Sequence, residues 1–329
     1  MTKKSRKVWF SHQILGIGIA LVSLCFLLWI LDYFMSDKPT FLSYENIMNI
    51  FIQTSIITII SVGMTFIIIT GGIDLSIGSV VALCSMTCGL SMLSILNMGG
   101  FSQIFIGIFM GLLIGSSIGF INGFVIVKGR IPPYIVTFSM LGIVRGFAIC
   151  LNGSQSANLY DKITPNFLFI GNGTIFGVPF PFILALIIVG ISYIILNNMR
   201  FGRYVIAVGA SEDAAKLSGI SVNKYKFLVY LVGGFLAGLA GIIYTSKLGY
   251  FSPNIGVGFE LYAIASVIIG GTTLSGGKGT IIGTLFGALL IGVLDNGLTL
   301  LNISDEIKQV FVGIIIISVV LLDRLRKMN

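Results

Sequence analysis

The feature that most constrains this chain is a series of long apolar stretches that recurs from one end of the sequence to the other. Ten such stretches occupy residues 14–34, 46–69, 75–96, 103–127, 134–151, 180–196, 227–246, 259–274, 280–300 and 307–322. A helix needs about 20 apolar residues to cross the hydrocarbon core of a bilayer. The sequence therefore predicts an all-α polytopic membrane protein with about ten transmembrane helices.

Composition agrees with this fold class and excludes a soluble domain. The 329 residues are 56% hydrophobic and 10% charged, whereas a soluble domain carries roughly 25% charged residues. The formal net charge of +8 could indicate a nucleic-acid partner, but the basic residues are scattered at the ends of the apolar stretches and form no stripe with interleaved aromatic side chains. We therefore expect the lipid bilayer, and no nucleic acid, as the partner.

The distribution of Lys and Arg predicts the orientation in the membrane. With a cytoplasmic N-terminus, fifteen basic residues face the cytoplasm, Arg145 lies within a helix, and four face the other side, namely Lys38, Lys162, Lys247 and Lys308. An excess of this kind marks the cytoplasmic loops. The first stretch is too long for a signal-peptide core and no small-residue cleavage site follows it, so we expect it to be retained.

The predicted organisation has three parts, with both termini in the cytoplasm. A cytoplasmic N-terminal segment covers residues 1–13, a transmembrane domain covers 14–323, and a cytoplasmic tail covers 324–329. The transmembrane domain includes a cytoplasmic segment at 197–226, which is the only long polar run in the chain.

Segment 197–226 contains the signals of one short helix. Ser211 is a good N-cap, two acidic residues follow it in the first turn, and Gly219 is placed to end the helix in a left-handed conformation. A helix of about two turns is not stable alone in water, so its small apolar residues suggest a face that meets a partner. A solvated loop with one helical turn is the alternative, and it fits the local signal equally well. The residues assigned to a partner contact are Ser211, Glu212, Asp213, Ala214, Ala215, Leu217 and Gly219.

Glycines recur at every fourth position in two of the apolar stretches. One set is Gly107, Gly111, Gly115, Gly119 and Gly123, and the other is Gly279, Gly283 and Gly287. In lipid, small residues at this spacing allow two helix backbones to approach closely. Both stripes therefore predict tight helix packing.

A paired glycine and a carboxylate interrupt the apolar sequence at residues 70–78, which read Thr-Gly-Gly-Ile-Asp-Leu-Ser-Ile-Gly. Ionisable residues at membrane depth are costly and usually functional, so Asp74 is a candidate for the transport pathway, together with Ser76. The alternative, that Asp74 caps the helix beginning at Leu75, is at least as well supported. Residues 270–275 match residues 71–76 at four of six positions, which leaves an internal repeat possible.

Polar residues also lie toward the outer end of the stretch 280–300. Asn296 is the third pathway candidate, and its neighbour Asp295 lies at a depth where it could meet Arg145. Whether Asp295 and Arg145 pair is left open by the sequence. The loop 152–181 is the longest on the outer side and could receive an external partner or serve only as a connection.

Two apparent nucleotide-binding motifs are rejected. Residues 274–278, Leu-Ser-Gly-Gly-Lys, resemble the signature loop of transporter ATPases and the tail of a phosphate-binding loop. The required earlier glycine and the Ser or Thr after the lysine are missing, so a tight cytoplasmic turn is favoured. The sequence also lacks a metal cluster, a nucleophile and base pair, and a cofactor fingerprint. We expect no enzyme activity and no cofactor bound by this chain.

Several motifs, taken in order, carry a resemblance to a known family. They are Thr70-Gly-Gly-Ile-Asp-Leu-Ser-Ile-Gly78, Lys128-Gly-Arg130, Gly202-Arg203-Tyr204, Ala214-Ala-Lys-Leu-Ser-Gly-Ile220, Ile269-Gly-Gly-Thr272, Gly276-Gly-Lys-Gly279 and Asn296-Gly-Leu298. With them, the chain from about residue 46 to 323 resembles the membrane-spanning permease subunit of a ribose-type, binding-protein-dependent ABC importer. Ser211-Glu-Asp stands where relatives often have Gly-Asn-Glu before the paired alanines, and this departure leaves the docking role intact.

The resemblance implies a function and a set of partners. It implies a homodimer of permeases in the bacterial plasma (inner) membrane, an extracytoplasmic sugar-binding protein, and a separate cytoplasmic ATPase that carries ATP and magnesium. It also implies that the short helix after Ser211 is the coupling helix that docks on the ATPase. Related carriers of autoinducer-2, xylose, galactose or nucleosides share the architecture, so the solute is left open. An ion-coupled secondary transporter and a channel are the alternatives from other classes.

Overall fold

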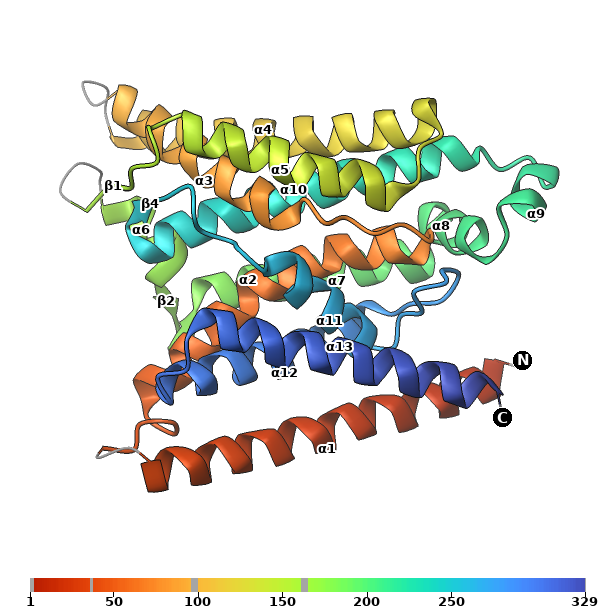
Figure 1. The fold of residues 1–329 in the computed structure, drawn as a ribbon, viewed down its shortest axis with the longest axis horizontal. Helices are drawn as coiled ribbons and strands as arrows, with labels where there is room; N and C mark the ends of the chain where they lie inside the picture. The colour runs from red at the N-terminus through yellow and green to blue at the C-terminus, as the bar shows by residue number, and fades with distance from the viewer. Residues whose placement is uncertain (1–2, 36–37, 96–99, 161–164, 329) are drawn as a thin grey trace.

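The computed structural model describes residues 3–35, 38–95, 100–160 and 165–328, with side chains from residue 15 to residue 321 within those ranges. The side chains of the predicted terminal segments 1–13 and 324–329 lie outside this part of the chain, and so does Lys162. The described chain forms a bundle of helices (Figure 1).

Helices dominate the element order, and the strands are short. The helices are α1 (Lys3–Met35), α2 (Tyr44–Ile69), α3 (Ile77–Ser94), α4 (Gly100–Gly129), α5 (Pro133–Cys150), α6 (Pro165–Asn172), α7 (Phe180–Asn198), α8 (Arg200–Ala210), α9 (Glu212–Leu217), α10 (Val222–Leu248), α11 (Phe259–Ile269), α12 (Ile281–Leu300) and α13 (Asp305–Met328). The strands are β1 (Ala157–Asn158), β2 (Thr174–Ile175), β3 (Val178–Pro179) and β4 (Tyr250–Phe251). Strand β1 pairs with β4 and β2 pairs with β3, both antiparallel.

Eight helices in the described residues are long and apolar enough to cross a membrane, namely α1, α2, α3, α4, α5, α7, α10 and α12. The chain is therefore a predominantly helical, multi-pass membrane protein. Helix α2 is the centre of the bundle, because α7, α10, α11 and α12 pack around it. Its second half, from Thr54 to Ile69, is buried without interruption.

The glycine stripe of α4 lies against α10. A Cβ at Gly115 would lie 2.5 Å from the carbonyl oxygen of Gly234 and 2.8 Å from the Cα of Gly238, and a Cβ at Gly119 would clash with the Tyr230 carbonyl oxygen. Gly123 meets the backbone of Phe227 in the same way. At the other end of α4, Gly107 and Gly111 pack on side chains of Met92 and Ile242. Because no side chain fits between the backbones, only glycine permits this approach.

The second glycine set brings α12 against α11. A Cβ at Gly283 or Gly287 would clash with the carbonyl oxygens of Gly270 and Ser266, respectively. Gly279 lies before the helix, beside Ile69.

The helix expected over residues 259–274 is shorter than the sequence suggested. Helix α11 has 11 residues and ends at Ile269, so it is about 16 Å long, roughly half of the 30 Å hydrocarbon core. The cause is the glycine pair that follows, since Gly271 has a φ of +89° and ends the helix. The flanking chain is not helical, yet Phe251 and Ile255 before α11 and Thr272 after it are buried. Non-helical backbone at membrane depth is stable when protein surrounds it.

Helices α2 and α11 end in the same way, which bears on the suspected repeat. After α2, the N–H groups of Gly71 and Gly72 donate to the carbonyls of Ile68 and Ile67, and Gly71 has a φ of +79°. After α11, Gly271 and Thr272 donate to Ile268 and Val267. Both are Schellman ends. In the structure Gly71 occupies the same position as Gly271, whereas the sequence match aligned Gly71 with Gly270. The similarity is limited to helix termination, because the segments that follow differ in hydrogen bonding.

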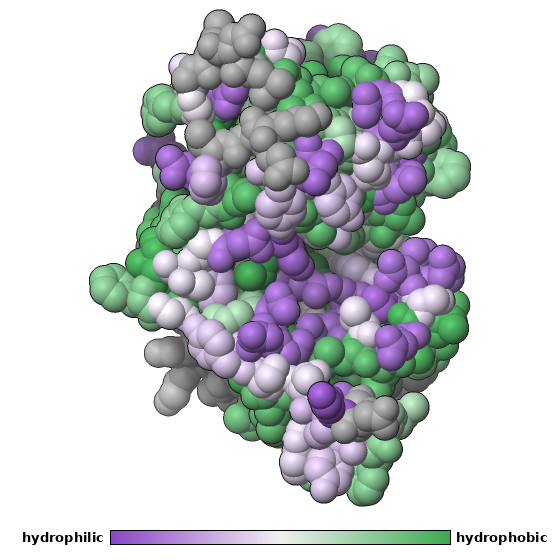
Figure 2. Space-filling model, turned by 90° about the vertical axis from the view of Figure 1, so that its left-hand side faces the viewer, coloured by the Kyte–Doolittle hydropathy of each residue, from purple (hydrophilic) through white to green (hydrophobic). Residues whose placement is uncertain are grey.

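The two ends of the bundle differ in character. The start of α1, the end of α13 and helices α8 and α9 lie together at the right of Figure 1. At the opposite end, Figure 2 shows hydrophilic residues gathered across the middle of the surface, between more apolar regions above and below. Residues 152–160 and 165–181 of the long loop lie at this second end (Figure 1). There α6 is tied to α10, because the Asn172 side-chain amide donates to the Lys247 carbonyl at 2.9 Å.

Candidate functional site

Helices α8 and α9 form a compact projection between α7 and α10. The Ser211 hydroxyl accepts a hydrogen bond from the Ala214 N–H at 3.2 Å and caps α9. At the other end, Gly219 has a φ of +77° and donates to Lys216, while Ile220 donates to Ala215. This is a complete Schellman end. The start and stop of this helix therefore lie where the sequence placed them.

The two faces of α9 have different environments. Ala215 is only 3% exposed and packs on Val208 and Val222, so its methyl group belongs to the interior of the projection. Leu217 is 91% exposed, and Ala214 is also exposed. The apolar side chains available to a partner are therefore Ala214 and Leu217, whereas Ala215, which the sequence assigned to the same contact, is used within the chain.

Two ion pairs involve the charged residues of α9. Glu212 pairs with Lys226 at the start of α10, and Asp213 pairs with Lys216 at 3.6 Å. Exposed pairs of this kind contribute little stability, about 0 to 1 kcal/mol. Only the Glu212–Lys226 pair joins α9 to α10, because Asp213 and Lys216 both lie within α9.

Asp74 lies in the connection between α2 and α3 and is 2% exposed. Its Oδ1 accepts hydrogen bonds from the N–H and the hydroxyl of Ser76 at 2.8 and 2.6 Å. The Ser76 hydroxyl in turn accepts from the Asn122 amide at 3.0 Å. Asp74 therefore bonds to Ser76, the residue that precedes α3. The capping alternative placed the start of this helix at Leu75, whereas α3 begins at Ile77 and has no side-chain capping bond at Ser76. Asn122 on α4 completes a cluster that the sequence did not indicate.

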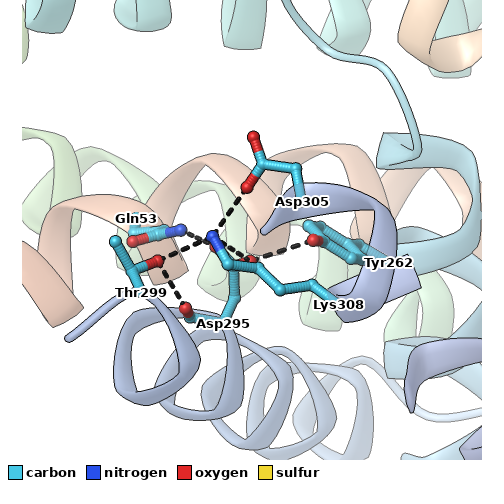
Figure 3. Close-up of polar contacts among 6 residues, drawn as sticks. All are labelled: Gln53, Tyr262, Asp295, Thr299, Asp305 and Lys308. Atoms are coloured by element: carbon cyan, nitrogen blue, oxygen red, sulfur yellow. Dashed lines mark hydrogen bonds and ion pairs between the residues drawn. The ribbon is translucent and has the colours of Figure 1, made fainter. Parts of the chain in front are cut away.

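A second buried polar cluster joins four helices near the opposite end from α9 (Figure 3). Asp295 of α12 accepts a hydrogen bond from the Tyr262 hydroxyl at 2.9 Å and another from the Gln53 amide. Lys308 of α13 lies 3.8 Å from Asp295. The Lys308 ammonium also donates to Thr299 at 2.8 Å and to Asp305 at 2.7 Å. Helices α2, α11, α12 and α13 are thereby connected.

The partners of Asp295 could not be read from the sequence, because they come from helices far apart in the chain. One local signal existed, since Lys308 follows Asp305 at the i, i+3 spacing of a helical ion pair. Arg145 does not join this cluster. Its guanidinium donates to the carbonyls of Pro253 and Ile255 and so holds the non-helical segment before α11.

The third pathway candidate, Asn296, is 6% exposed. Its amide nitrogen donates to Asn46 Oδ1 at 2.9 Å, and Asn46 donates to the Phe41 carbonyl. Thus the structure places Asp74 and Ser76 together, and Asn296 in a different contact at the start of α2.

The segment 273–278 is a tight turn. The Thr273 N–H donates to the Lys278 carbonyl at 3.1 Å, and Gly276 and Gly277 both have positive φ values. Among the described residues, His, Cys, Asp and Glu form no group of three that could hold a metal ion.

A helical bundle with eight helices long and apolar enough to cross a membrane, and with a capped projecting helix, defines a polytopic membrane protein. Residues 46–320 match the family described as branched-chain amino acid transport system / permease component. The chain belongs to this family of permeases. It is accordingly a multi-pass protein of the bacterial inner membrane and a transport subunit rather than an enzyme.

Curated relatives give the comparison more detail. The ribose import permease protein RbsC of Escherichia coli K12 is 39% identical over 96% of this chain and 95% of its own length. RbsC of Bacillus subtilis is 42% identical over 87% of each chain. The D-allose transport system permease protein AlsC of E. coli is 37% identical over 87% of this chain and 85% of its own. No solved structure matches the chain significantly.

Proposed function

We propose that the chain is the permease subunit of an ABC importer that carries ribose or a related simple sugar. The observation that carries this proposal is the identity of about two residues in five with ribose permeases over nearly the whole chain. The D-allose permease, at 37% identity, marks the range of related sugars that fit the same architecture. Autoinducer-2, xylose, galactose and nucleosides are the other solutes to be tested.

The proposed assembly has two copies of this permease, a cytoplasmic ATPase that binds ATP and magnesium, and an extracytoplasmic sugar-binding protein. ATP-driven closure of the ATPase moves α9 in both copies, and the route through the permeases changes the side to which it opens. The exposed Leu217 on a helix held by Ser211 and Gly219 supports a docking role for α9.

The proposed topology has ten membrane segments with both termini in the cytoplasm. Helix α11, together with its buried flanking segments, serves as one of the ten, and α13 as the last. The joint position of α8, α9, the start of α1 and the end of α13 at one end of the bundle supports this arrangement. The domain ranges 1–13, 14–323 and 324–329 follow from it.

We propose that Asp74, Ser76 and Asn296 affect transport by shaping the segments beside the route rather than by binding protons. Asp74 and Ser76 are already hydrogen-bonded to each other, and Asn296 to Asn46. A neutral sugar needs hydroxyl and amide contacts rather than a titrating group. The second candidate function is an ion-coupled transporter, which the buried Asp295–Lys308 pair favours because such pairs occur in proton and ion relays.

Leu217→Glu tests the docking that the proposed function requires. Because Leu217 is 91% exposed, the change leaves the packing of this chain intact. A charge buried in a docking groove costs several kcal/mol, so association with the ATPase is expected to weaken by at least about a hundredfold. The measurement is the amount of ATPase that the tagged permease retains in detergent. It is compared at equal abundance of the permease in the membrane.

The matched control is Asn223→Glu, which adds the same charge at an exposed position nearby. We expect this variant to retain the ATPase. Ala215→Glu is not a clean test, since it disrupts the contact with Val208 and Val222. If Leu217→Glu retains the ATPase as well as Asn223→Glu does, α9 is not the docking helix.

A further inference from the structure

Three backbone segments far apart in the sequence meet where the projection joins the bundle. The carbonyl oxygen of Ile69, at the end of α2, accepts a hydrogen bond from the Gly277 N–H at 2.8 Å. A Cβ at Gly209, in the last turn of α8, would clash with that same oxygen and would lie 2.6 Å from the Gly277 nitrogen. A Cβ at Gly276 would lie 2.9 Å from the Gly209 carbonyl oxygen. We call Gly209, Gly276, Gly277 and the Ile69 carbonyl the glycine junction.

Only glycine fits at Gly209 and Gly277, for two different reasons. Gly209 lies in a helix, where alanine is otherwise favoured by about 1 kcal/mol, so the reason for glycine there is the close approach to α2. Gly277 has a φ of +76°, and its Cβ would lie 2.8 Å from the Cα of Ala210. The junction therefore has no side chain between its three segments, and a displacement of one passes directly to the others.

A second contact joins the same two elements. The rings of Phe201 on α8 and Phe66 on α2 lie 6.0 Å apart between centroids, and Phe201 also lies 5.9 Å from Tyr225 on α10. Helix α8 is therefore fixed to the end of α2 at two points, one near each of its own ends.

Helix α2 extends from this junction to the polar clusters at the other end of the bundle. Its 26 residues correspond to about 39 Å. Its end at Ile69 touches the junction, while Gln53 and Asn46 near its beginning bind Asp295 and Asn296. Helix α2 is continuous from Tyr44 to Ile69 and is buried from Thr54 onward, so it joins the junction to these polar clusters without a break.

We propose that the glycine junction, with Gly209 as its positioning residue, transmits the movement of α8 and α9 to α2 and thereby to the outer polar cluster around Asp295. The proposal rests on the proposed function, because the ATPase supplies the movement at α9. It goes further by assigning the path through the bundle to α2 and by assigning a transport role to residues that contact neither the ATPase nor the solute.

Gly209→Ala separates transmission from docking. The new methyl group forces α8 away from the Ile69 carbonyl but leaves Leu217 and the exposed face of α9 unchanged. We expect normal retention of the ATPase and continued ATP hydrolysis in proteoliposomes with the whole complex. Sugar taken up per ATP hydrolysed should fall by at least about fivefold, the lower end of common coupling effects. A residue with a merely structural role would lower abundance without changing this ratio.

Gly190→Ala on α7 is the matched control, because a Cβ there meets nothing within 4 Å. This variant should take up as much sugar per ATP hydrolysed as the unchanged protein does. A normal ratio in Gly209→Ala at normal abundance would overturn the proposal. If Gly209→Ala does not reach the membrane, Phe201→Leu is measured instead. Its sugar uptake per ATP hydrolysed should fall, and an unchanged value would overturn the proposal.

The outcomes distinguish this inference from the proposed function. If the proposed function is wrong, the unchanged protein itself shows no ATP-dependent uptake and retains no ATPase. If only the junction is wrong, the unchanged protein and Gly209→Ala are equally well coupled.

Discussion

At the scale of single residues, several buried polar side chains of the bundle are hydrogen-bonded to other groups of the same chain. Asp74 is the clearest case, because both hydrogen bonds to its Oδ1 come from Ser76. Leaving a buried donor without its acceptor costs about 1–3 kcal/mol. The carboxylate is therefore explained by its bonds to Ser76 just before α3, and we predict that it affects transport through the shape of the α2–α3 connection.

This explanation predicts opposite outcomes for two substitutions of Asp74. Asp74→Asn retains an oxygen that can accept from Ser76, so uptake of labelled ribose should remain substantial. Asp74→Leu leaves both Ser76 donors unsatisfied, and most uptake should be lost. Uptake is compared at equal membrane abundance. Abolished transport in the Asn variant would indicate that a titrating carboxylate is needed and would favour the ion-coupled alternative.

Residue-level contacts were predictable only where they are local. The cap by Ser211 and the left-handed stop at Gly219 were expected because a helix end is specified within a few residues. The contacts of Asp295 with Gln53 and Tyr262 were not expected, since they depend on which helices become neighbours. The burial of Ala215 was missed for the same reason, as its neighbours Val208 and Val222 lie on two other helices.

At the scale of elements, small residues decide which helices touch. The spacing of glycines indicated a contact face on α4, and the structure supplies α10 as the helix that it meets. For α11 the sequence was misleading. The apolar run 259–274 is long enough for a full helix, but the helix ends at Ile269 because Gly271 stops it. Apolar composition identifies burial, and the glycine pair decides where the helix ends.

Gly115→Ala tests the seam between α4 and α10. A Cβ there would lie 2.5 Å from the Gly234 carbonyl oxygen, and overpacking of this kind costs about 1–3 kcal/mol. The melting temperature of the purified protein in detergent should fall below that of Gly142→Ala, where a Cβ meets nothing within 4 Å. A Gly115→Ala protein that melts at or above the control temperature would show that α4 and α10 do not need this close contact.

At the scale of the whole molecule, charge and apolar length predicted the class and the orientation, whereas the arrangement of the helices came from the structure. The side of the membrane is checked with single cysteines in a variant that lacks the four natural ones. An impermeant maleimide added outside should label cysteine at Phe176 and Asp305, and should not label it at Ser211 or Lys278. The first pair lies at the end opposite α9, and Phe176 is fully exposed. Reversed labelling would invert the topology and remove the docking role of α9.

The central claim is that ATP hydrolysis on a partner drives a sugar through this permease. Its most direct test is uptake of labelled ribose by proteoliposomes that contain the permease, its ATPase and the ribose-loaded binding protein. ATP and magnesium on the ATPase side should produce uptake without a proton gradient, and competition by unlabelled D-allose should report the range of sugars. A proton gradient without ATP should produce none. Uptake that follows the proton gradient and ignores ATP would contradict the account.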